Sequence, residues 1–409
     1  MDIKYPSVSY LQKTMVPRQK DHYRIHIVGL SHLPVSGRYA GCAFTSKVNH
    51  MAKMLTDLGH EVYVYGAESG DPVCTEYVVT HSLQDIRDAW GDGDNRFDIG
   101  YNWREGMFRH DINKEQTECT KKFIANSITE INKRKQPDDF LMIMQGYFNK
   151  PIADAVNLFL TMEPGIGYRG SVPKLSSGRT VYRGFESSYI MNFTYGRENA
   201  QTGETPNGAY YDRVFPNYFD DKDFTFKKDK QDYFFFIGRL IHRKGVQTAI
   251  ETAKALGKKI IIAGQLDENE KIDMSYKGAE YVGYVDPDKR TKLMASAKAC
   301  FIPTWYLEPF GGTNVESQLC GTPVLTTDFG AFLDTVEQGV TGFRCHTLND
   351  FVQCAKLVDT LDPKIIRKRA ERYLMSNMMW ELEDWMRELY QVYLSATVPN
   401  TKGWSLIMV

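Results

Sequence analysis

The stretch EPFGGTNVES, residues 308–317, places two carboxylates eight positions apart around a pair of glycines. The strand CFIPT precedes it, so Glu308 stands at the tip of a loop, where a carboxylate can accept hydrogen bonds from sugar hydroxyls. Gly311 and Gly312 let a ligand approach the backbone, and the amides of the following helix can meet a phosphate. Glu316, inside that helix, can take both hydroxyls of a ribose. An ordinary loop entering an ordinary helix is the alternative, but it needs neither both acids nor both glycines.

A second stretch, GRLIHRKG, residues 238–245, follows the strand YFFFI. After Gly238, the residues Arg239 and Lys244 place two cations at the carboxyl end of this strand. Arginine offers a planar fork to phosphate oxygens and lysine adds a mobile point charge, so the pair suits a diphosphate. A solvated basic turn is the alternative.

The elements around both stretches alternate between strand and helix. From residue 233 on, helices such as VQTAIETAKAL and DKRTKLMASAK separate the strands YFFFI, KKIIIAG, AEYVGYV, CFIPT and TPVLTTD. Nearer the N-terminus, YRIHIVGL and HEVYVYG enclose a helix from about residue 42 to 58, and DFLMIMQG and NLFLTMEP continue the series. This alternation predicts an α/β fold of two doubly wound, Rossmann-like domains, with a ligand cleft at the carboxyl ends of the strands.

The chain of 409 residues exceeds what one core usually organises, which also predicts two domains. A Pro-Asn turn and a charged run follow Arg213, and they place the boundary so that the domains cover 1–217 and 218–376, with a C-terminal segment over 377–409. Residues from about 68 to 110 are polar and rich in Asp and Gly, which predicts little regular structure. Helices are expected at about 119–133, from Pro151, at 185–196 and at 376–394.

These motifs resemble the signature of retaining glycosyltransferases of the GT-B fold, in particular glycosyltransferase family 4. The likeness rests on the EPFG motif with its two Glu residues, the GRL and KG turn, the Pro-Asn linker and the terminal helix, and it covers most of residues 215–395. It implies a metal-independent transferase of glycan biosynthesis that moves a hexose-type sugar from a nucleoside-diphosphate sugar, with UDP or GDP as the nucleotide, to an acceptor hydroxyl. It also implies that the last helix crosses back to the first domain.

The resemblance assigns a role to each motif residue. Glu308 contacts the donor sugar, while Arg239 and Lys244 hold the diphosphate, and we expect these three to be the catalytic residues. The strand-end stretch around Gly283 resembles the one that lies beside the nucleotide base in the family. The donor-binding residues expected in the second domain are Gly238, Gly283, Tyr284, Phe310, Gly311, Gly312, Thr313 and Glu316.

The first domain departs from the family pattern. Family members often carry a His after the strand that here reads DFLMIMQG, where it lines the reacting sugar, and this chain has Gln145. Either Gln145 supplies a neutral hydrogen bond, or the role passes to Glu163 or Glu186, although both acids also suit helix-end or buried polar pairing. The loop VSGRYAG contributes Gly37 on the donor side and Arg38 on the acceptor side of the cleft, but its glycines equally suit a tight turn.

Metal binding is not expected. Asp92-Gly93-Asp94 has the form of the manganese motif of the other glycosyltransferase fold, but it follows no strand. His26 lies within a strand and His32 just beyond it, without a carboxylate or Cys at ligand spacing. We therefore predict no metal and no cofactor other than the nucleotide sugar as co-substrate.

Composition narrows the class of protein further. The 50 basic and 51 acidic side chains nearly cancel, so no global field attracts nucleic acid. No window approaches the roughly 18 uninterrupted apolar residues of a membrane span, and the first twenty residues lack the apolar core of a secretory signal. Seven scattered cysteines without a CxxC pair favour reduced thiols. We expect a cytoplasmic protein without a transmembrane segment, with peripheral membrane contact left open.

Two other classes are left open by the sequence. A nucleotide-sugar epimerase shares the fold and would form product without an acceptor. A non-catalytic nucleotide-sugar binding protein would bind without transfer or hydrolysis. The acceptor, whether a glycan, lipid, protein, small molecule or nucleic acid, does not follow from the sequence, and neither does the oligomeric state.

Overall fold

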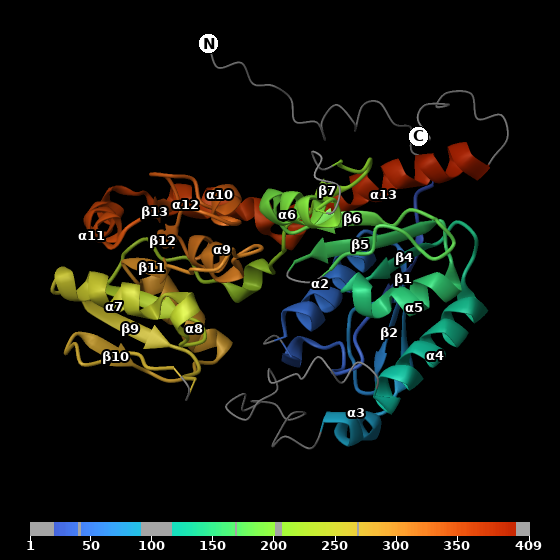
Figure 1. Cartoon of the computed structure of the whole chain (residues 1–409), viewed down its shortest axis with the longest axis horizontal. Helices are drawn as coiled ribbons and strands as arrows, with labels where there is room; N and C mark the ends of the chain where they lie inside the picture. The colour runs from blue at the N-terminus through green and yellow to red at the C-terminus, as the bar shows by residue number, and fades with distance from the viewer. Residues whose placement is uncertain are drawn as a thin grey trace, which may run out of the picture. The chain divides into compact units, whose positions relative to one another are not determined.

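The computed structural model describes residues 20–39, 42–90, 117–167, 170–200, 207–267 and 270–397. The chain divides into two compact units (Figure 1). The first unit contains the described residues up to Phe185, within Thr194–Phe215 and from Met375 on. The second contains Glu186–Phe193 and Pro216–Leu374. The sequence places all of 1–217 in one domain, whereas in the structure the short segment Glu186–Phe193 packs with the second unit.

The first unit is built on a parallel sheet whose described strands run in the order β3-β2-β1-β4-β5-β6-β7. Its strands are buried and rich in β-branched and aromatic residues, as expected for a sheet covered on both faces. The order reverses direction between β1 and β4, the point where doubly wound sheets bind their ligands. The strands are β1 (Arg24–Val28), β2 (Glu61–Ala67), β3 (Glu76–His81), β4 (Phe140–Ile143), β5 (Leu160–Ile166), β6 (Tyr182–Phe185) and β7 (Arg213–Val214).

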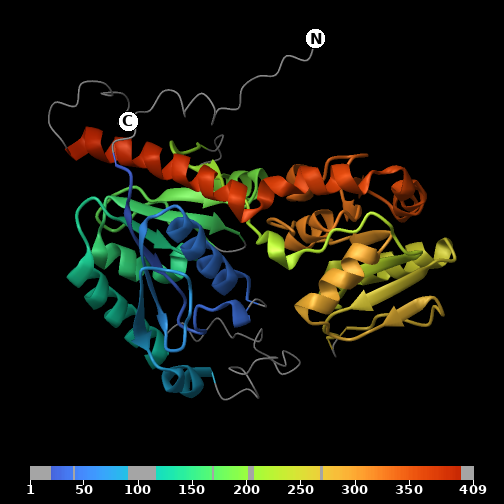
Figure 2. The same ribbon diagram turned by 180° about the vertical axis from the view of Figure 1, so that it is seen from behind.

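Helices cover this sheet, and the last helix of the chain is one of them. Helix α13 packs against α2 and β5 (Figure 2). The Nε2 atom of His60 lies 2.7 Å from Oε2 of Glu383 in α13, and Trp385 is fully buried. The helical segments are η1 (Gly37–Tyr39), α2 (Ala43–Asp57), α3 (Leu83–Trp90), α4 (Glu118–Arg134), α5 (Gly146–Val156), α13 (Met375–Thr397) and the part of α6 (Ser188–Glu198) from Thr194 on.

The prediction of little regular structure over residues 68–110 is wrong for its first half, which contains β3 and α3. Strand β3 lies at an edge of the sheet, and Val78 is buried while Val79 is exposed, so its apolar pattern is short. Helix α3 begins with a reciprocal cap, in which Ser82 and Asp85 each bind the other's backbone N–H. Asp92-Gly93-Asp94 lies outside the described residues.

Helix α5 begins five residues earlier than its proline predicts. Gln145 adopts a left-handed backbone conformation with φ of 55°, and the helix starts at Gly146. Pro151 therefore lies inside α5. The expectation of a helix start at Pro151 rested on the preference of proline for the first turn, and the tight turn at Gln145 overrides it.

The second unit contains a parallel sheet whose described strands run in the order β10-β9-β8-β11-β12-β13. Successive phenylalanines of β8 point to opposite faces: Phe235 packs with helices α9 and α12, while Phe234 and Phe236 pack with α7 and α11. The sheet is thus covered on both sides. The strands are β8 (Tyr233–Ile237), β9 (Lys259–Ala263), β10 (Ala279–Tyr281), β11 (Ala299–Ile302), β12 (Val324–Thr327) and β13 (Gly342–Cys345).

The chain enters and leaves the second unit at neighbouring points, because Phe219 pairs with Leu374 in a parallel bridge. The Phe219 N–H donates to the carbonyl of Tyr373 at 3.0 Å. The helical segments between these ends are η4 (Asp221–Asp223), η5 (His242–Lys244), α7 (Val246–Ala255), α8 (Pro287–Ser296), α9 (Gly312–Leu319), α10 (Phe332–Thr335), α11 (Leu348–Leu357), η6 (Val358–Thr360), α12 (Pro363–Ala370) and η7 (Glu371–Tyr373).

The two parallel sheets with interleaved helices confirm the predicted α/β class. All seven cysteines lie in the described part of the chain, and none of them forms a disulfide. Among the described helices, none is both long enough and apolar enough to span a membrane.

Candidate active site

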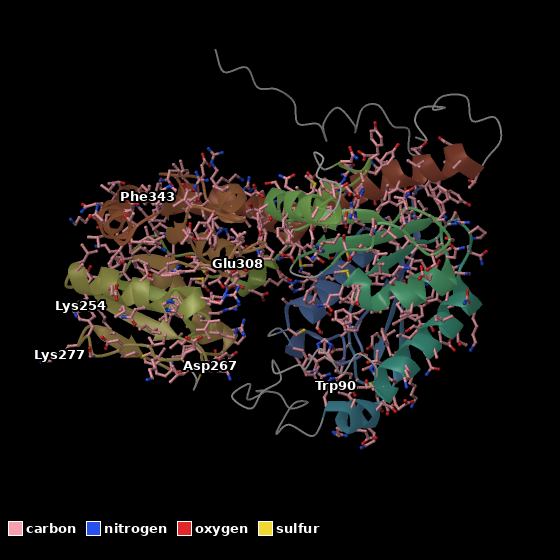
Figure 3. The ribbon with its side chains drawn as sticks, in the orientation of Figure 1. Trp90, Lys254, Asp267, Lys277, Glu308 and Phe343 are labelled. Carbon is pink, nitrogen blue, oxygen red and sulfur yellow. The ribbon has the colours of Figure 1, made fainter. Side chains whose placement is uncertain are left out.

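The two sequence motifs meet at the point where the strand order of the second sheet reverses. Strands β8 and β11 are neighbours there, and they run parallel, so their carboxyl ends lie at the same edge. The loop after β8 carries Arg239 and Lys244, and the loop after β11 carries Glu308, which is labelled in Figure 3. Doubly wound sheets bind ligands at this position. The structure therefore brings the three predicted catalytic residues to one edge of the second sheet.

The loop after β8 is held in place by its neighbours. The Gly238 N–H donates to Ala263 and the Leu240 N–H to Gln265, so the loop is bonded to the end of β9. Gly245 has φ of 74° and lies so close to β11 that an added Cβ atom would stand 2.0 Å from the carbonyl oxygen of Pro303. Arg239 is exposed at the strand end, and no carboxylate of the described residues pairs with it. Its guanidinium is thus available to an anionic ligand.

Lys244 and Glu308 form an ion pair across the two loops. The Nζ atom of Lys244 lies 3.0 Å from Oε2 of Glu308, whose residue is only 7% exposed. Lys244 and Arg243 both lie over the ring of Tyr306, each 4.9 Å from its centroid. Burial is the largest single effect and favours the neutral form of Lys244, but the charge of Glu308 and the contacts with Tyr306 together outweigh it and raise the pKa of the ammonium. Lys244 is therefore charged at neutral pH, and a positive and a negative group stand side by side at the sheet edge.

The backbone of the Glu308 loop is anchored on both sides of the Glu308-Pro309 peptide. The carbonyl of Glu308 accepts from the Ala331 N–H at 2.9 Å. The carbonyl of Pro309 accepts from the Ser187 hydroxyl at 2.5 Å. Ser187 belongs to the segment Glu186–Phe193, which packs with the second unit.

Ser188 adds a second anchor from the same segment. Its backbone N–H and its hydroxyl each donate to the carboxylate of Asp334 in α10 at 2.6 Å. The sequence alone does not predict a role for Ser187, Ser188 or Asp334. The pair of serines before α6 is a helix-cap signal, but nothing in the sequence connects it with a loop more than a hundred residues away.

The start of α9 has the predicted form. Gly311 precedes the helix in a left-handed conformation, and no side chain of the described residues caps it. An added Cβ atom at Gly311 would stand 2.8 Å from the ring of Phe332. The first amides, at Gly312 and Thr313, are partly exposed and can meet an anion. Phe310 is different: its side chain is 2% exposed and packs against Phe219 and Tyr373 in the core. The prediction that Phe310 binds the donor can therefore apply to its backbone alone.

Glu316 lies one turn into α9 and faces α8. Its Oε1 atom is 3.5 Å from Nη2 of Arg290, and its side chain is 14% exposed. Gly283 and Tyr284 lie in the loop between β10 and α8, and Tyr284 is 38% exposed. Gly283 and Tyr284 thus follow a strand on one side of the reversal point, while Glu316 lies in the helix that follows β11 on the other side. The sequence does not predict a role for Arg290.

In the first unit, Arg38 is bound by its own neighbourhood. Its guanidinium donates to the carbonyl of Ser69 at 2.7 Å and to the hydroxyl of Ser36 at 3.1 Å, and it lies 3.8 Å from Asp71. Gly37 opens the short helix η1 next to it. In this conformation Arg38 stabilises the loops after β1 and β2, so an acceptor contact by Arg38 requires it to leave Ser69.

Glu163 and Gln145 are directly linked through the turn before α5. One carboxyl oxygen of Glu163 accepts from the Gly146 N–H at 2.9 Å and the other from the Val172 N–H at 2.8 Å. Burial raises the pKa of this carboxyl to about 8, although the two N–H groups oppose the shift. Glu163 thus holds the left-handed turn at Gln145, and it is buried. The residue that faces outward from this pair is Gln145, which is partly exposed.

Glu186 does not group with the other acceptor-side candidates. It is 7% exposed and belongs to the segment that packs with the second unit. Glu186 directly follows β6, but it is grouped with the second unit together with Ser187, which contacts the Glu308 loop. The sequence assigned it to the first domain because the predicted boundary lies after residue 217.

No group of three or more His, Cys, Asp or Glu in the described residues is arranged to hold a metal ion. His26 has a carboxylate partner that its sequence neighbours do not reveal, because its Nε2 atom lies 3.1 Å from Oδ2 of Asp139. Its Nδ1 atom lies 2.8 Å from the hydroxyl of Tyr65. All three residues are buried, so the group belongs to the core of the first unit.

The second unit matches a known family. Residues 218–372 match the family model of the glycosyl transferases group 1. The matched range contains Arg239, Lys244, Glu308 and Glu316, and it lies within the second unit.

Curated relatives match part of the chain. The glycogen synthase of Mycobacterium tuberculosis is 30% identical over 177 residues, which are 39% of this chain and 42% of the relative. The capsular polysaccharide biosynthesis glycosyltransferase CapM of Staphylococcus aureus is 25% identical over 178 residues, or 39% of this chain and 46% of the relative. The chain thus matches less than half of the length of either relative.

Solved structures resemble the chain over almost its whole length. Sucrose-phosphate synthase from Thermosynechococcus elongatus has a TM-score of 0.58 at 15% identity, with 92% of this chain and 100% of that chain covered. A glycosyltransferase involved in avilamycin A biosynthesis has a TM-score of 0.59 at 17% identity, with coverage of 90% and 98%. The Anabaena protein HepE, in complex with UDP and glucose, has a TM-score of 0.56 at 14% identity, with coverage of 89% and 99%. At these identities the likeness shows the fold, which is GT-B as predicted.

Proposed function

We propose that this protein is a retaining, metal-independent glycosyltransferase that moves a hexose-type sugar from a nucleoside-diphosphate sugar to an acceptor hydroxyl. The observation that carries the proposal is the ion pair of Lys244 and Glu308 at the reversal point of the second sheet. It brings a cation for a leaving phosphate and a carboxylate for sugar hydroxyls within one hydrogen bond of each other. The family match of residues 218–372 supports the same reaction class.

The second unit offers groups for each part of the donor. Arg239, Lys244 and the first amides of α9 would hold the diphosphate, so that fixed protein charges and dipoles take the place of a divalent cation. Glu308 would accept hydrogen bonds from the sugar hydroxyls, and Glu316 would accept them from the ribose. UDP is the first nucleotide to test, because HepE is in complex with UDP and glucose.

The proposed reaction proceeds on one face of the sugar. The bond from the anomeric carbon to the diphosphate oxygen breaks, and both of its electrons go to that oxygen. The acceptor oxygen bonds to the anomeric carbon on the same face, and its proton passes to the leaving phosphate. Arg239 and Lys244 stabilise the charge that grows on the diphosphate. This path needs no enzyme nucleophile, so it does not require a carboxylate beyond Glu308.

The acceptor side belongs to the first unit in this proposal. Gln145 is its leading candidate, because Glu163 holds the turn at the carboxyl end of β4 and leaves Gln145 partly exposed. The class of acceptor, including a lipid at a membrane surface, and the predicted cytoplasmic location stay predictions.

Calorimetric titration tests the proposal. The purified chain is titrated with UDP, GDP and ADP in EDTA, and then each matching nucleotide sugar is incubated with the chain and the release of free sugar is followed. Binding of one nucleotide in EDTA and slow release of its sugar are the expected results. Binding of none, or binding only after a divalent ion is restored, contradicts the metal-independent site. Binding without any release or transfer marks a non-catalytic protein.

A further inference from the structure

Two consecutive serines in the segment that follows β6 hold the loop of Glu308. The Ser187 side chain is fully buried, and its hydroxyl donates to the carbonyl of Pro309 at 2.5 Å. The same oxygen accepts from the Ile190 N–H at 3.3 Å, so it also caps the start of α6. A hydroxyl can donate only one hydrogen bond, and the Ser187 hydroxyl donates its bond to the Pro309 carbonyl. The contact is therefore specific to this carbonyl.

The second serine fixes the opposite side of the loop through α10. Ser188 gives both of its donors to the carboxylate of Asp334, each at 2.6 Å. Hydrogen bonds to a charged acceptor are stronger than those between neutral groups. Asp334 lies three residues after Ala331, whose N–H holds the carbonyl of Glu308. The segment thus contacts the Pro309 carbonyl directly, and it contacts α10 close to the Ala331 N–H that holds the Glu308 carbonyl.

Helix α10 is tied in turn to α9. The side chain of Asn314 donates to the hydroxyl of Thr335 at 2.6 Å, and that of Gln318 donates to the carbonyl of Thr335 at 2.8 Å. All three residues are buried. The first turns of α9 thus have anchors at Thr335 that involve neither serine, whereas the Glu308 loop is held by the serines.

We propose that Ser187, assisted by Ser188, is a positioning residue that sets the place of the Glu308 carboxylate by holding the Pro309 carbonyl. The inference rests on the proposed function for the claim that Glu308 contacts the donor sugar. Neither serine reaches the phosphate-binding groups Arg239 and Lys244, which belong to the loop after β8. The two parts of the donor should therefore respond differently when the serine is changed.

Hydrogen exchange of the unliganded chain tests the positioning directly. Ser187→Ala should raise the exchange of amides in residues 305–314 about tenfold, the effect expected for the loss of one hydrogen bond. Thr252→Val is the matched control, because Thr252 is also buried in the second unit and its hydroxyl donates to the carbonyl of Thr248 in α7. It should leave 305–314 unchanged. Unchanged exchange of 305–314 in both Ser187→Ala and Ser188→Ala overturns the proposal.

Ligand affinity gives the second readout. UDP, GDP and ADP are compared with UDP-glucose, GDP-mannose and ADP-glucose by calorimetry. In Ser187→Ala the gain in affinity that the sugar contributes should fall about tenfold, while affinity for the free nucleotide stays within about twofold. Ser188→Ala should act in the same direction. Equal losses for nucleotide and nucleotide sugar, or a retained sugar gain, overturn the proposal.

The two readouts separate this inference from the proposed function. A wild-type chain that binds no nucleotide and no nucleotide sugar refutes the proposed donor site. In that case the exchange measurement still decides whether Ser187 holds the Glu308 loop, because it uses the chain without ligand.

Discussion

Lys244 and Glu308 lie 3.0 Å apart, Nζ to Oε2, although they come from loops that follow two different strands of the second sheet. In the chain without ligand, each charge is the partner of the other. A sugar donor that replaces the contact between these two side chains must offer a negative group to Lys244 and hydroxyl donors to Glu308. A nucleoside-diphosphate sugar offers both within a few bonds.

Glu308→Gln should lower the rate of sugar transfer about 100-fold, a loss typical of removing one charged group that acts in the transition state. Lys244→Met should lower it comparably. Because the two side chains are partners, the double variant should lose less than the sum, with a coupling of about 1 kcal/mol or more in the barrier. Steady-state rates of the four proteins measure this. Glu280→Gln serves as control, since Glu280 forms an exposed pair with Lys259; strictly additive losses contradict the partnership.

Arg239→Ala should reduce turnover more than donor affinity, because charge on the leaving diphosphate grows toward the transition state. We expect a loss of about tenfold or more in kcat with a smaller change in the dissociation constant of the donor. Kinetics and calorimetry of the same preparation test it. Arg369, an exposed residue of α12 that pairs with Glu337, offers the control Arg369→Ala. A raised KM with unchanged kcat would falsify the assignment.

Glu316→Ala should weaken binding of the free nucleotide about tenfold, the effect of one or two lost hydrogen bonds to the ribose. Arg290→Ala should have a smaller effect in the same direction, because Arg290 only faces Glu316 at 3.5 Å. Titration with the nucleotide and with its 2′-deoxy form separates the roles. An unaltered affinity in Glu316→Ala removes this residue from the ribose site.

Gly245→Ala should destabilise the loop of Arg239 and Lys244. Gly245 has φ of 74°, and an added Cβ atom would stand 2.0 Å from the Pro303 carbonyl oxygen. We expect a lower melting temperature together with lost nucleotide binding. Gly257→Ala is the matched control, because Gly257 has φ of 63° but no atom within 4 Å of the added Cβ. It carries only the left-handed strain of about 1 to 2 kcal/mol. Equal effects of the two variants would show that the contact with Pro303 is unimportant.

The carboxyl of Glu163 should make the stability of the first unit depend on pH. Burial raises its pKa to about 8 from an ordinary 4.5, so between these values the folded chain holds a proton that the unfolded chain has lost. Its contribution is therefore greatest below pH 4.5 and falls as the pH rises through 8. Glu163→Gln, which is neutral throughout, should gain stability relative to the wild type as the pH rises across this window.

Melting temperatures measured by calorimetry from pH 5 to pH 9 test this difference. Gln has one side-chain acceptor fewer than Glu, and this loss changes the melting temperature by an amount that does not vary with pH. Only the slopes of melting temperature against pH are therefore compared. Glu118→Gln is the control, because the Glu118 side chain is 89% exposed. Parallel curves for the wild type and Glu163→Gln would rule out a shifted carboxyl.

The sequence predicted the groups that depend on order along the chain. Arg239, Lys244 and Glu308 each lie in the loop that follows a buried strand, and parallel strands bring such loops to one edge of a sheet. The same rule yields the α/β class. It cannot predict the neighbours that folding supplies from afar, such as Ser187 for Pro309, Arg290 for Glu316 or Asp139 for His26.

The orientation of single side chains also could not be predicted from the sequence pattern. Phe310 lies inside the motif but points into the core, because the left-handed Gly311 redirects the chain after it. Arg38 binds Ser69 on a loop more than thirty residues away. Strand β3 was missed because an edge strand buries only one face and needs few apolar residues.

The position of α13 at the end of the chain also sets an order for folding during synthesis. Glu383 and Trp385 complete the interior of the first unit, yet the ribosome adds them after the whole second unit has been made. The second unit has both of its ends paired through Phe219 and Leu374, so its sheet can close as soon as residue 374 emerges. The first unit is thus synthesised first but completed last. Until α13 is added, His60 and the residues of β5 that α13 covers are exposed to water or to a chaperone.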